Sequence, residues 1–166
     1  MEQIIEELIA IIAQEIDAFN ELLKTLHQKQ RAIVEGEIDR LNKSVQVENK
    51  IAGQTKSLEA ERQERARELA EKLSLENVNP KLSEIIEKVE AKYALRLQEQ
   101  RELLKPLVGK VQNLNENNQF LLDYSLKFIE KSMDLLLNGE EKKNLYQANG
   151  KLDKKLQKNM LINHCI

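Results

Sequence analysis

The side chains that most often carry enzymatic chemistry are few in this chain and lie far apart. His27 and His164 are separated by most of the sequence, and neither has a cysteine or carboxylate at a spacing typical of a metal site. The sequence contains no recognisable glycine-rich phosphate loop and no serine–histidine–aspartate set. Cys165, the only cysteine, is interpreted as an incidental thiol. We therefore expect no enzyme, no metal and no cofactor, which leaves noncovalent binding as the chemistry to explain.

A row of polar side chains within residues 112–128 is the first candidate for such binding. Four asparagines fall within six residues there, and local propensity would assign them to a loop. Leu114, Leu121 and Phe128 nevertheless keep a spacing of seven residues through the stretch, so we interpret it as helix. The polar residues that we assign to the seam of this helix are Asn115, Asn118 and Ser125.

Asn118 needs a hydrogen-bond partner if the seam is buried. The other expected seams offer four candidate partners: Glu15, Glu48, Thr55 and Arg62. A single buried asparagine in a helical bundle fixes the register of the helices at some cost in stability. The competing interpretation, that the polar row lines an accessible groove and meets a binding partner, stays open at this point.

Composition favours long helices and argues against several classes of partner. The 166 residues include only five glycines and two prolines, no tryptophan, and 33% charged residues. A net charge of −2 gives no reason to expect nucleic acid or an acidic membrane as a partner. The N-terminal apolar run at residues 8–13 follows no basic region and is too short for a signal peptide or a membrane span. We expect a cytoplasmic protein without membrane insertion.

Two long helices are predicted in the first half of the chain. Residues 2–35 repeat apolar side chains every seven residues, and Gly36 supplies a residue that can adopt positive φ after the helix end. Asp39 is predicted to cap a second helix over 40–74. Residues 59–68 of that helix hold no apolar side chain larger than alanine, so we expect them to form a solvated helix tip.

Two more helical segments follow. Asn79–Pro80 predicts the start of a third segment over 81–105, and Pro106 predicts a kink or boundary. The fourth segment, 107–137, ends at Asn138–Gly139. The expected fold is all-α: an elongated antiparallel bundle or coiled coil of three long helices plus a helical arm.

The C-terminal residues differ in composition from the rest of the chain. Residues 139–166 carry six lysines and three acidic residues, and Leu152, Leu156 and Met160 recur every four residues. We therefore predict a bundle over 1–138 and a mobile tail over 139–166 that contains one short amphipathic helix.

Several motifs of this sequence, and their order along the chain, resemble those of the FlgN family of flagellar export chaperones. The pattern N-x-x-N…LL-x-x-S-L is carried by Asn115, Asn118, Leu121, Leu122, Ser125 and Leu126. Before it come "AIVEGEIDRL" at the end of the first helix and a second helix that carries Glu48, Leu58 and Arg62 in an E…L-x-x-x-R pattern. After it comes Y-x-x-x-G, formed by Tyr146 and Gly150. The resemblance covers nearly the whole chain.

The resemblance implies a function as well as a fold. Members of the family are cytoplasmic bacterial chaperones that bind the C-terminal segments of the two hook–filament junction proteins, which are hook-associated proteins. They keep these clients unassembled and deliver them to the membrane protein of the flagellar type III export gate. By the same resemblance, the mobile C-terminal part takes part in client binding, and Tyr146 is the residue that would dock on the export gate.

The apolar residues suggest where a client would bind. Client segments of this kind would be amphipathic helices, and the fourth segment offers more apolar surface than one seam can bury. The tail residues would clasp the client or cover the groove without it. The predicted client-binding residues are Leu107, Leu114, Leu121, Tyr124, Phe128 and Leu135 in the fourth segment, with Leu152, Leu156 and Met160 in the tail.

The main alternative is a structural coiled coil or scaffold protein that self-associates through its heptads. The helix breaks near 36–39 and 74–80 argue against it, because they fold the chain back on itself. We expect a monomer, and a weak homodimer stays open. A chaperone for another secretion client is a further alternative.

Overall fold

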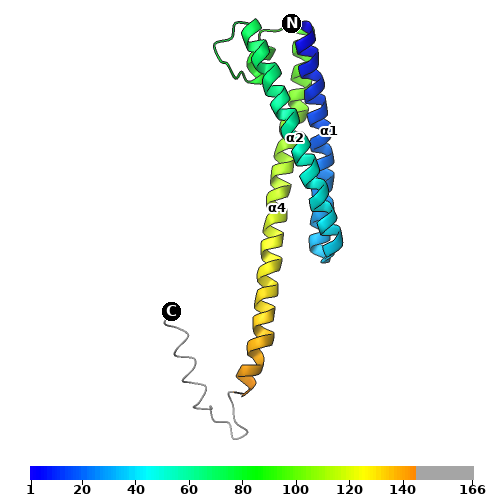
Figure 1. Cartoon of the computed structure of the whole chain (residues 1–166), viewed down its shortest axis with the longest axis vertical. Coiled ribbons are helices and arrows are strands. Elements are labelled where there is room, and N and C mark those ends of the chain that lie inside the picture. The colour runs from blue at the N-terminus through cyan, green and yellow to red at the C-terminus, as the bar shows by residue number, and fades with distance from the viewer. Residues whose placement is uncertain (145–166) are drawn as a thin grey trace. The chain divides into compact units, whose positions relative to one another are not determined.

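The computed structural model describes residues 1–144, and side chains within residues 1–137. Its helices are α1 (Glu2–Glu35), α2 (Ile38–Lys72), α3 (Leu82–Ile86) and α4 (Ala91–Asn144) (Figure 1). The predicted all-α bundle class is confirmed. By its internal contacts the chain divides into two units, Met1–Leu121 and a second that begins at Leu122. The predicted tail residues Tyr146, Leu152, Leu156 and Met160 lie outside the described residues.

A two-residue reversal, Gly36 and Glu37, joins α1 to α2. Gly36 has φ 69°, which a glycine adopts without strain, and the Glu37 N–H donates to the Ala32 carbonyl at 2.9 Å. The predicted bounds of the first helix and the role of Gly36 are confirmed. The predicted cap at Asp39 is wrong, because the reversal is so short that α2 begins at Ile38. Asp39 lies in the first turn of α2, where its negative charge interacts favourably with the positive end of the helix dipole.

The core of the first unit forms around α1. The heptad residues Ile5, Ile12 and Leu26 are at most 1% exposed. One cluster joins α1 to Leu69 of α2 and Leu97 of α4, and smaller clusters follow along the helix. Each buried leucine or isoleucine contributes about 1.5–3 kcal/mol relative to an exposed one. Burial against two neighbours explains why α1 has apolar side chains on adjacent rows.

Three polar contacts show that α1 and the first part of α4 run parallel. Arg96 pairs with Glu6 at 2.6 Å, the Gln100 side chain donates to the Ile9 carbonyl at 3.0 Å, and Asn118 contacts Leu26 further along. The residue numbers therefore rise together along both helices. Because α2 runs back along α1, the first unit is an up–down–up bundle whose third helix is residues 91–121 of α4 (Figure 1).

The predicted boundary at Pro106 is wrong. The helix α4 runs through Pro106 without a break and also passes the expected stop at Asn138–Gly139. A proline inside a helix costs about 3 kcal/mol, and the carbonyl of residue 102 loses its helical partner. Leu97 and Val111 on either side of Pro106 are buried. Pro106 and Glu102 are exposed, so water can replace the lost bond while tertiary packing maintains the helix.

The helix that follows α2 also begins later than predicted. The short helix α3 starts at Leu82 rather than after Asn79, and a turn at residues 87–90 separates it from α4. Arg67 donates to the Asn79 side chain at 2.8 Å, which holds the loop against α2. Asn79 is therefore used in the loop rather than as a helix cap.

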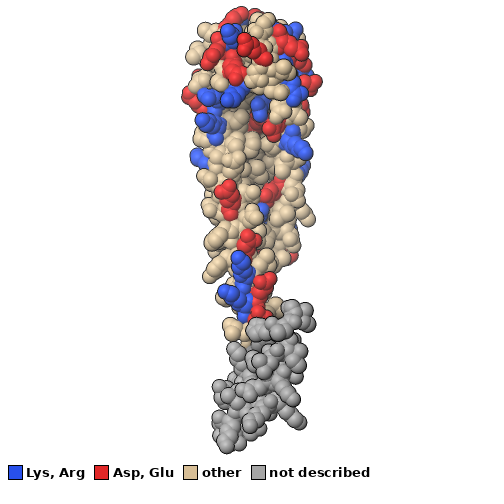
Figure 2. Space-filling model, turned by 90° about the vertical axis from the view of Figure 1, so that its left-hand side faces the viewer, with Lys and Arg blue, Asp and Glu red and all other residues tan. Residues whose placement is uncertain are grey.

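The charged run at 59–68 is only partly the solvated tip that the sequence predicted. Most of its side chains are exposed, but Arg62 is half-buried and Ala66 is buried. Figure 2 shows charged side chains of both signs crowded at the end of the first unit where α1 begins. Exposed ion pairs there, such as Arg96–Glu6 and Lys92–Glu2, contribute little to stability individually.

Candidate functional site: the apolar face of helix α4

Two residues of the predicted client-binding set belong to the core. Leu107 is 8% exposed and Leu114 is 9% exposed, and Leu114 packs with Leu26 of α1. The prediction that they bind a partner is wrong, because the bundle itself covers this part of the α4 seam. Leu121, at the end of the first unit, is half-buried.

Asn118 continues the buried row and is fully buried, at 0% exposure. Its Nδ2 donates to the Leu26 carbonyl at 2.8 Å, so it links α4 to α1. Its Oδ1 is buried and, among the described residues, has no hydrogen-bond partner. An unsatisfied buried acceptor costs about 1–3 kcal/mol. Asn118 thus has the structural position that its phase predicted, whereas Asn115 is exposed and lies outside the seam.

The four predicted partners of Asn118 are engaged elsewhere. Arg62 Nε donates to Glu15 Oε1 at 3.0 Å, and Lys29 Nζ donates to Glu48 Oε2 at 2.8 Å. The Thr55 hydroxyl donates to the carbonyl of residue 51 within its own helix. The sequence indicated polar groups on these seams but not their pairing.

The Glu15–Arg62 and Lys29–Glu48 ion pairs, the most buried of those between α1 and α2, fix the register of the hairpin. Each helix contributes one acid and one base, and the antiparallel direction matches both pairs at once. Burial raises the pKa of Glu15, while the nearby Arg62 guanidinium acts in the opposite direction. These charges orient the bundle that supports α4 rather than offering a surface to a ligand.

Beyond the first unit, α4 carries a face of exposed apolar side chains. Each is between 52% and 75% exposed. The exposed strip, as we name it, comprises Tyr124, Leu126, Phe128, Ile129, Met133, Leu135, Leu136 and Leu137. Single exposed apolar residues are ordinary, but a contiguous patch of this kind marks an interaction site.

The remaining circumference of this helix segment is charged. At about 100° per residue, its five charged side chains fall together on the side away from Ile129. They are Asp123, Lys127, Glu130, Lys131 and Asp134, all exposed. The segment is therefore amphipathic, although no described residue covers its apolar side.

Sequence reasoning found part of this surface. Tyr124, Phe128 and Leu135 were predicted and are exposed, whereas Leu126, Met133 and Leu137 were missed. Phe120, an exposed aromatic in the first unit, was also missed. The missed residues lie off the row of Leu121, Phe128 and Leu135, although Tyr124, which was predicted, lies off it too. A count of apolar side chains over the whole circumference would have found them.

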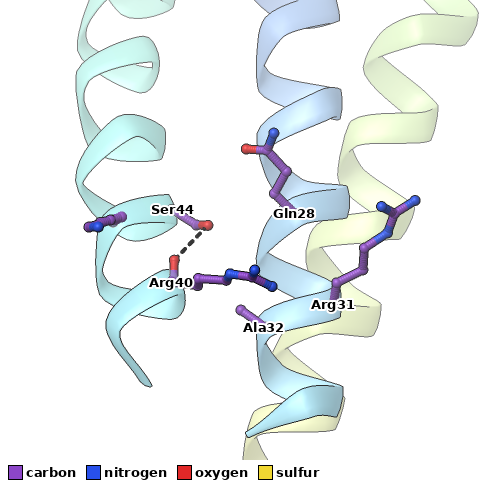
Figure 3. A pocket seen from close by; sticks show the side chains of 6 residues that line it. Gln28, Arg31, Ala32, Arg40 and Ser44 are labelled. Atoms are coloured by element: carbon purple, nitrogen blue, oxygen red, sulfur yellow. Dashed lines mark hydrogen bonds between the residues drawn. The ribbon is translucent and has the colours of Figure 1, made fainter. Parts of the chain in front are cut away.

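A hollow of about 350 Å³ between α1 and α2 is another surface feature. Figure 3 shows Arg40 extending from α2 towards Ala32 of α1, whereas Arg31 points to another side of α1. Arg40 is also paired with Glu35 and Glu37. The cationic groups do not converge on one point, so we assign this hollow no ligand.

The described residues also lack features of some other classes of protein. Residues 1–144 contain no group of three or more His, Cys, Asp or Glu side chains placed to hold a metal ion. Within the same residues, no helix combines the length and the apolar character that crossing a membrane requires.

Comparison with known proteins gives one match. The family model described as "FlgN protein" matches residues 1–154. No curated protein and no solved structure matches the chain. Because the family match covers nearly the whole chain, the protein belongs to the FlgN family of flagellar export chaperones, which bind hook-associated proteins.

Proposed function

We propose that this chain binds the C-terminal helical segments of the hook–filament junction proteins along the exposed strip of α4. It keeps these clients unassembled in the cytoplasm and delivers them to the export gate. The observation that supports this proposal is the strip itself, eight apolar side chains each more than half exposed. A chaperone needs such a surface before its client arrives, whereas a chain that functions alone would bury it.

The dimensions of the strip fit a helical client. From Tyr124 to Leu137 it spans 14 residues, which is about 21 Å, or four helical turns. An amphipathic helix of that length presents apolar anchors at i, i+3, i+4 and i+7. Aromatic residues such as Phe128 dominate the binding energy of interfaces of this kind.

The proposal extends to residues outside the described part. Leu152, Leu156 and Met160 would close over the client, and Tyr146 would dock on the export-gate protein. Removing residues 145–166 should weaken client binding in calorimetry, and unchanged affinity would reject the clasp. A Tyr146→Ala variant should keep client binding and lose gate binding. If both are kept, the docking role is rejected.

Co-expression and pull-down with candidate junction proteins test the client assignment. Whole junction proteins should be captured, and versions without their C-terminal segments should not. Equal capture of both would show that the client segment lies elsewhere. Failure to capture any junction protein would reject the client assignment and leave only the family membership.

A matched pair of variants tests the surface. Phe128→Glu puts a charge into the strip and should weaken client binding by about 30-fold or more. Lys127→Glu puts the same side chain on the neighbouring charged side and should leave affinity within about threefold. Equal effects of the two would place the client elsewhere.

Self-association is the second candidate function, because the same exposed strip could bury itself against another copy. Light scattering of the purified chain separates the two. A monomer that binds client supports the chaperone, and a stable dimer or filament that binds no client supports the scaffold.

A further inference from the structure

Two small side chains lie in the middle of the apolar face of α4. Ser125 and Ser132 are separated by seven residues and share one line along the helix. At about 100° per residue, Phe128 and Leu135 flank this line on one side, and Ile129 and Leu136 flank it on the other. The four flanking residues are all more than half exposed, whereas both serines are only partly exposed. We call this line, with its two apolar ridges, the serine groove.

The floor of the groove can accept an apolar partner. The Ser132 hydroxyl donates to the carbonyl of residue 128 in its own helix at 2.8 Å. Its donor is therefore satisfied before any partner arrives, and burial under an apolar side chain would leave no hydroxyl proton unpaired. A surface selected only for apolar area would gain from leucine at this position, so the small side chain needs a separate explanation.

We infer that Ser125 and Ser132 are specificity-determining residues of the client site. They let a client helix approach closely, with a continuous ridge of its large apolar side chains lying in the serine groove. Packing of a ridge into a groove fixes both the distance between two helices and their crossing angle. Small residues on one helix permit the closest approach, which adds contacts that apolar area alone does not supply. This inference rests on the proposed function.

The pattern favours a different helix as occupant over a second copy of this chain. Two parallel copies in register would place serine opposite serine and Phe128 opposite Phe128, so the small serines of one copy would face no large side chain of the other. An antiparallel pairing of Phe128 with Ser125 of the second copy would bring the second copy's Leu135 onto Asn118, which is already fully buried under α1. The next antiparallel register, seven residues along, would pair Phe128 with Ser132 of the second copy and bring the two Lys131 side chains near each other, a like-charge contact. Each of these self-pairings therefore carries a cost that a different helix need not carry.

The occupant has a definite chemistry. It is an amphipathic helix of about four turns with leucine, isoleucine, methionine or phenylalanine along one uninterrupted ridge. Small side chains along the centre of its stripe would leave the groove empty. Beside Lys131 it should carry a neutral or acidic residue rather than a basic one.

Calorimetry on the full chain tests this, with a peptide that corresponds to the C-terminal helical segment of a junction protein as the probe. Ser132→Leu fills the groove and should weaken binding about tenfold, although it adds apolar area. Ser132→Ala keeps the residue small and should bind within about twofold of the unmodified chain. Glu130→Leu adds the same leucine on the charged side and serves as the matched control. Leucine favours helix over serine, so weaker binding by Ser132→Leu would not reflect a melted helix.

The outcomes separate this inference from the proposed function. Equal or tighter binding by Ser132→Leu, with weak binding by Phe128→Glu, overturns the groove and leaves the client site in place. Unchanged binding by both variants overturns the proposed site as well. A chain that is dimeric by light scattering, and that Ser132→Leu makes monomeric, identifies a second copy as the occupant and also overturns the inference.

Discussion

The two parts of helix α4, before and after Leu121, have the same apolar spacing and opposite surroundings. Leu107 and Leu114 in the first part are covered by the bundle, whereas Phe128 and Leu135 in the second part are 65% and 74% exposed. The seven-residue spacing is unbroken between them. Periodicity therefore identifies the apolar face of a helix but not what covers it. In the first part the cover is α1, and in the second part we propose that it is the client.

A pair of leucine truncations on α4 gives the largest expected contrast between these parts. Leu97→Ala removes a side chain with 0% exposure and should lower the free energy of unfolding by about 2–5 kcal/mol. Leu135→Ala should change it by less than about 0.5 kcal/mol, because the side chain is already in water. Urea unfolding followed by circular dichroism measures both. A comparable loss for Leu135→Ala would mean that the strip is covered in the free chain.

Pro106→Ala tests what keeps the first part of α4 helical. If packing on α1 maintains the helix despite the proline, alanine restores the missing bond and should raise the free energy of unfolding by up to about 3 kcal/mol. Gly109→Ala is the matched control on the same helix, where an added methyl group meets nothing within 4 Å. It should stabilise the chain by about 1 kcal/mol. If Pro106→Ala destabilises the chain while Gly109→Ala does not, then the packing on α1 requires the proline.

The sequence predicted what depends on local pattern and missed what depends on tertiary contacts. The first helix and the turn at Gly36 were predicted correctly because capping and heptad spacing are local. At Pro106 the sequence predicted a kink or boundary, and the boundary is absent because burial of neighbours such as Leu97 offsets the cost of the proline. The helix α4, with 54 residues, is also longer than α1 and α2, with 34 and 35 residues. Only residues 91–121 of α4 belong to the first unit.

In the candidate site, too, local pattern predicted some features of the residues, and tertiary contacts decided the others. Burial of Asn118 followed from its phase, but its partner is a backbone carbonyl, which no side-chain pattern shows. Exposure of Phe128 rather than Leu114 could not be predicted, because both occupy equivalent positions on one row. Only the point at which the cover of α1 ends distinguishes core from surface on this helix.

The pH dependence of stability gives the smallest expected effect and concerns the first unit. Burial raises the pKa of Glu15 above its ordinary value of 4.5. Between 4.5 and the raised value, the folded chain binds more protons than the unfolded chain, so the contribution of Glu15 to stability increases as the pH falls through this window. Relative to Glu15→Gln, the unmodified chain should therefore gain on the order of 1 kcal/mol or less on acidification.

Urea unfolding at a series of pH values measures this difference, and the shared titration of the other carboxylates cancels. Arg62→Gln provides the contrast, since it removes the guanidinium that opposes the effect of burial and should enlarge the gain. If the unmodified chain instead loses stability faster than Glu15→Gln as the pH falls, then attraction to Arg62 outweighs burial. The ion pair would then stabilise the hairpin rather than only fix its register, and the bundle that positions α4 would weaken in acid.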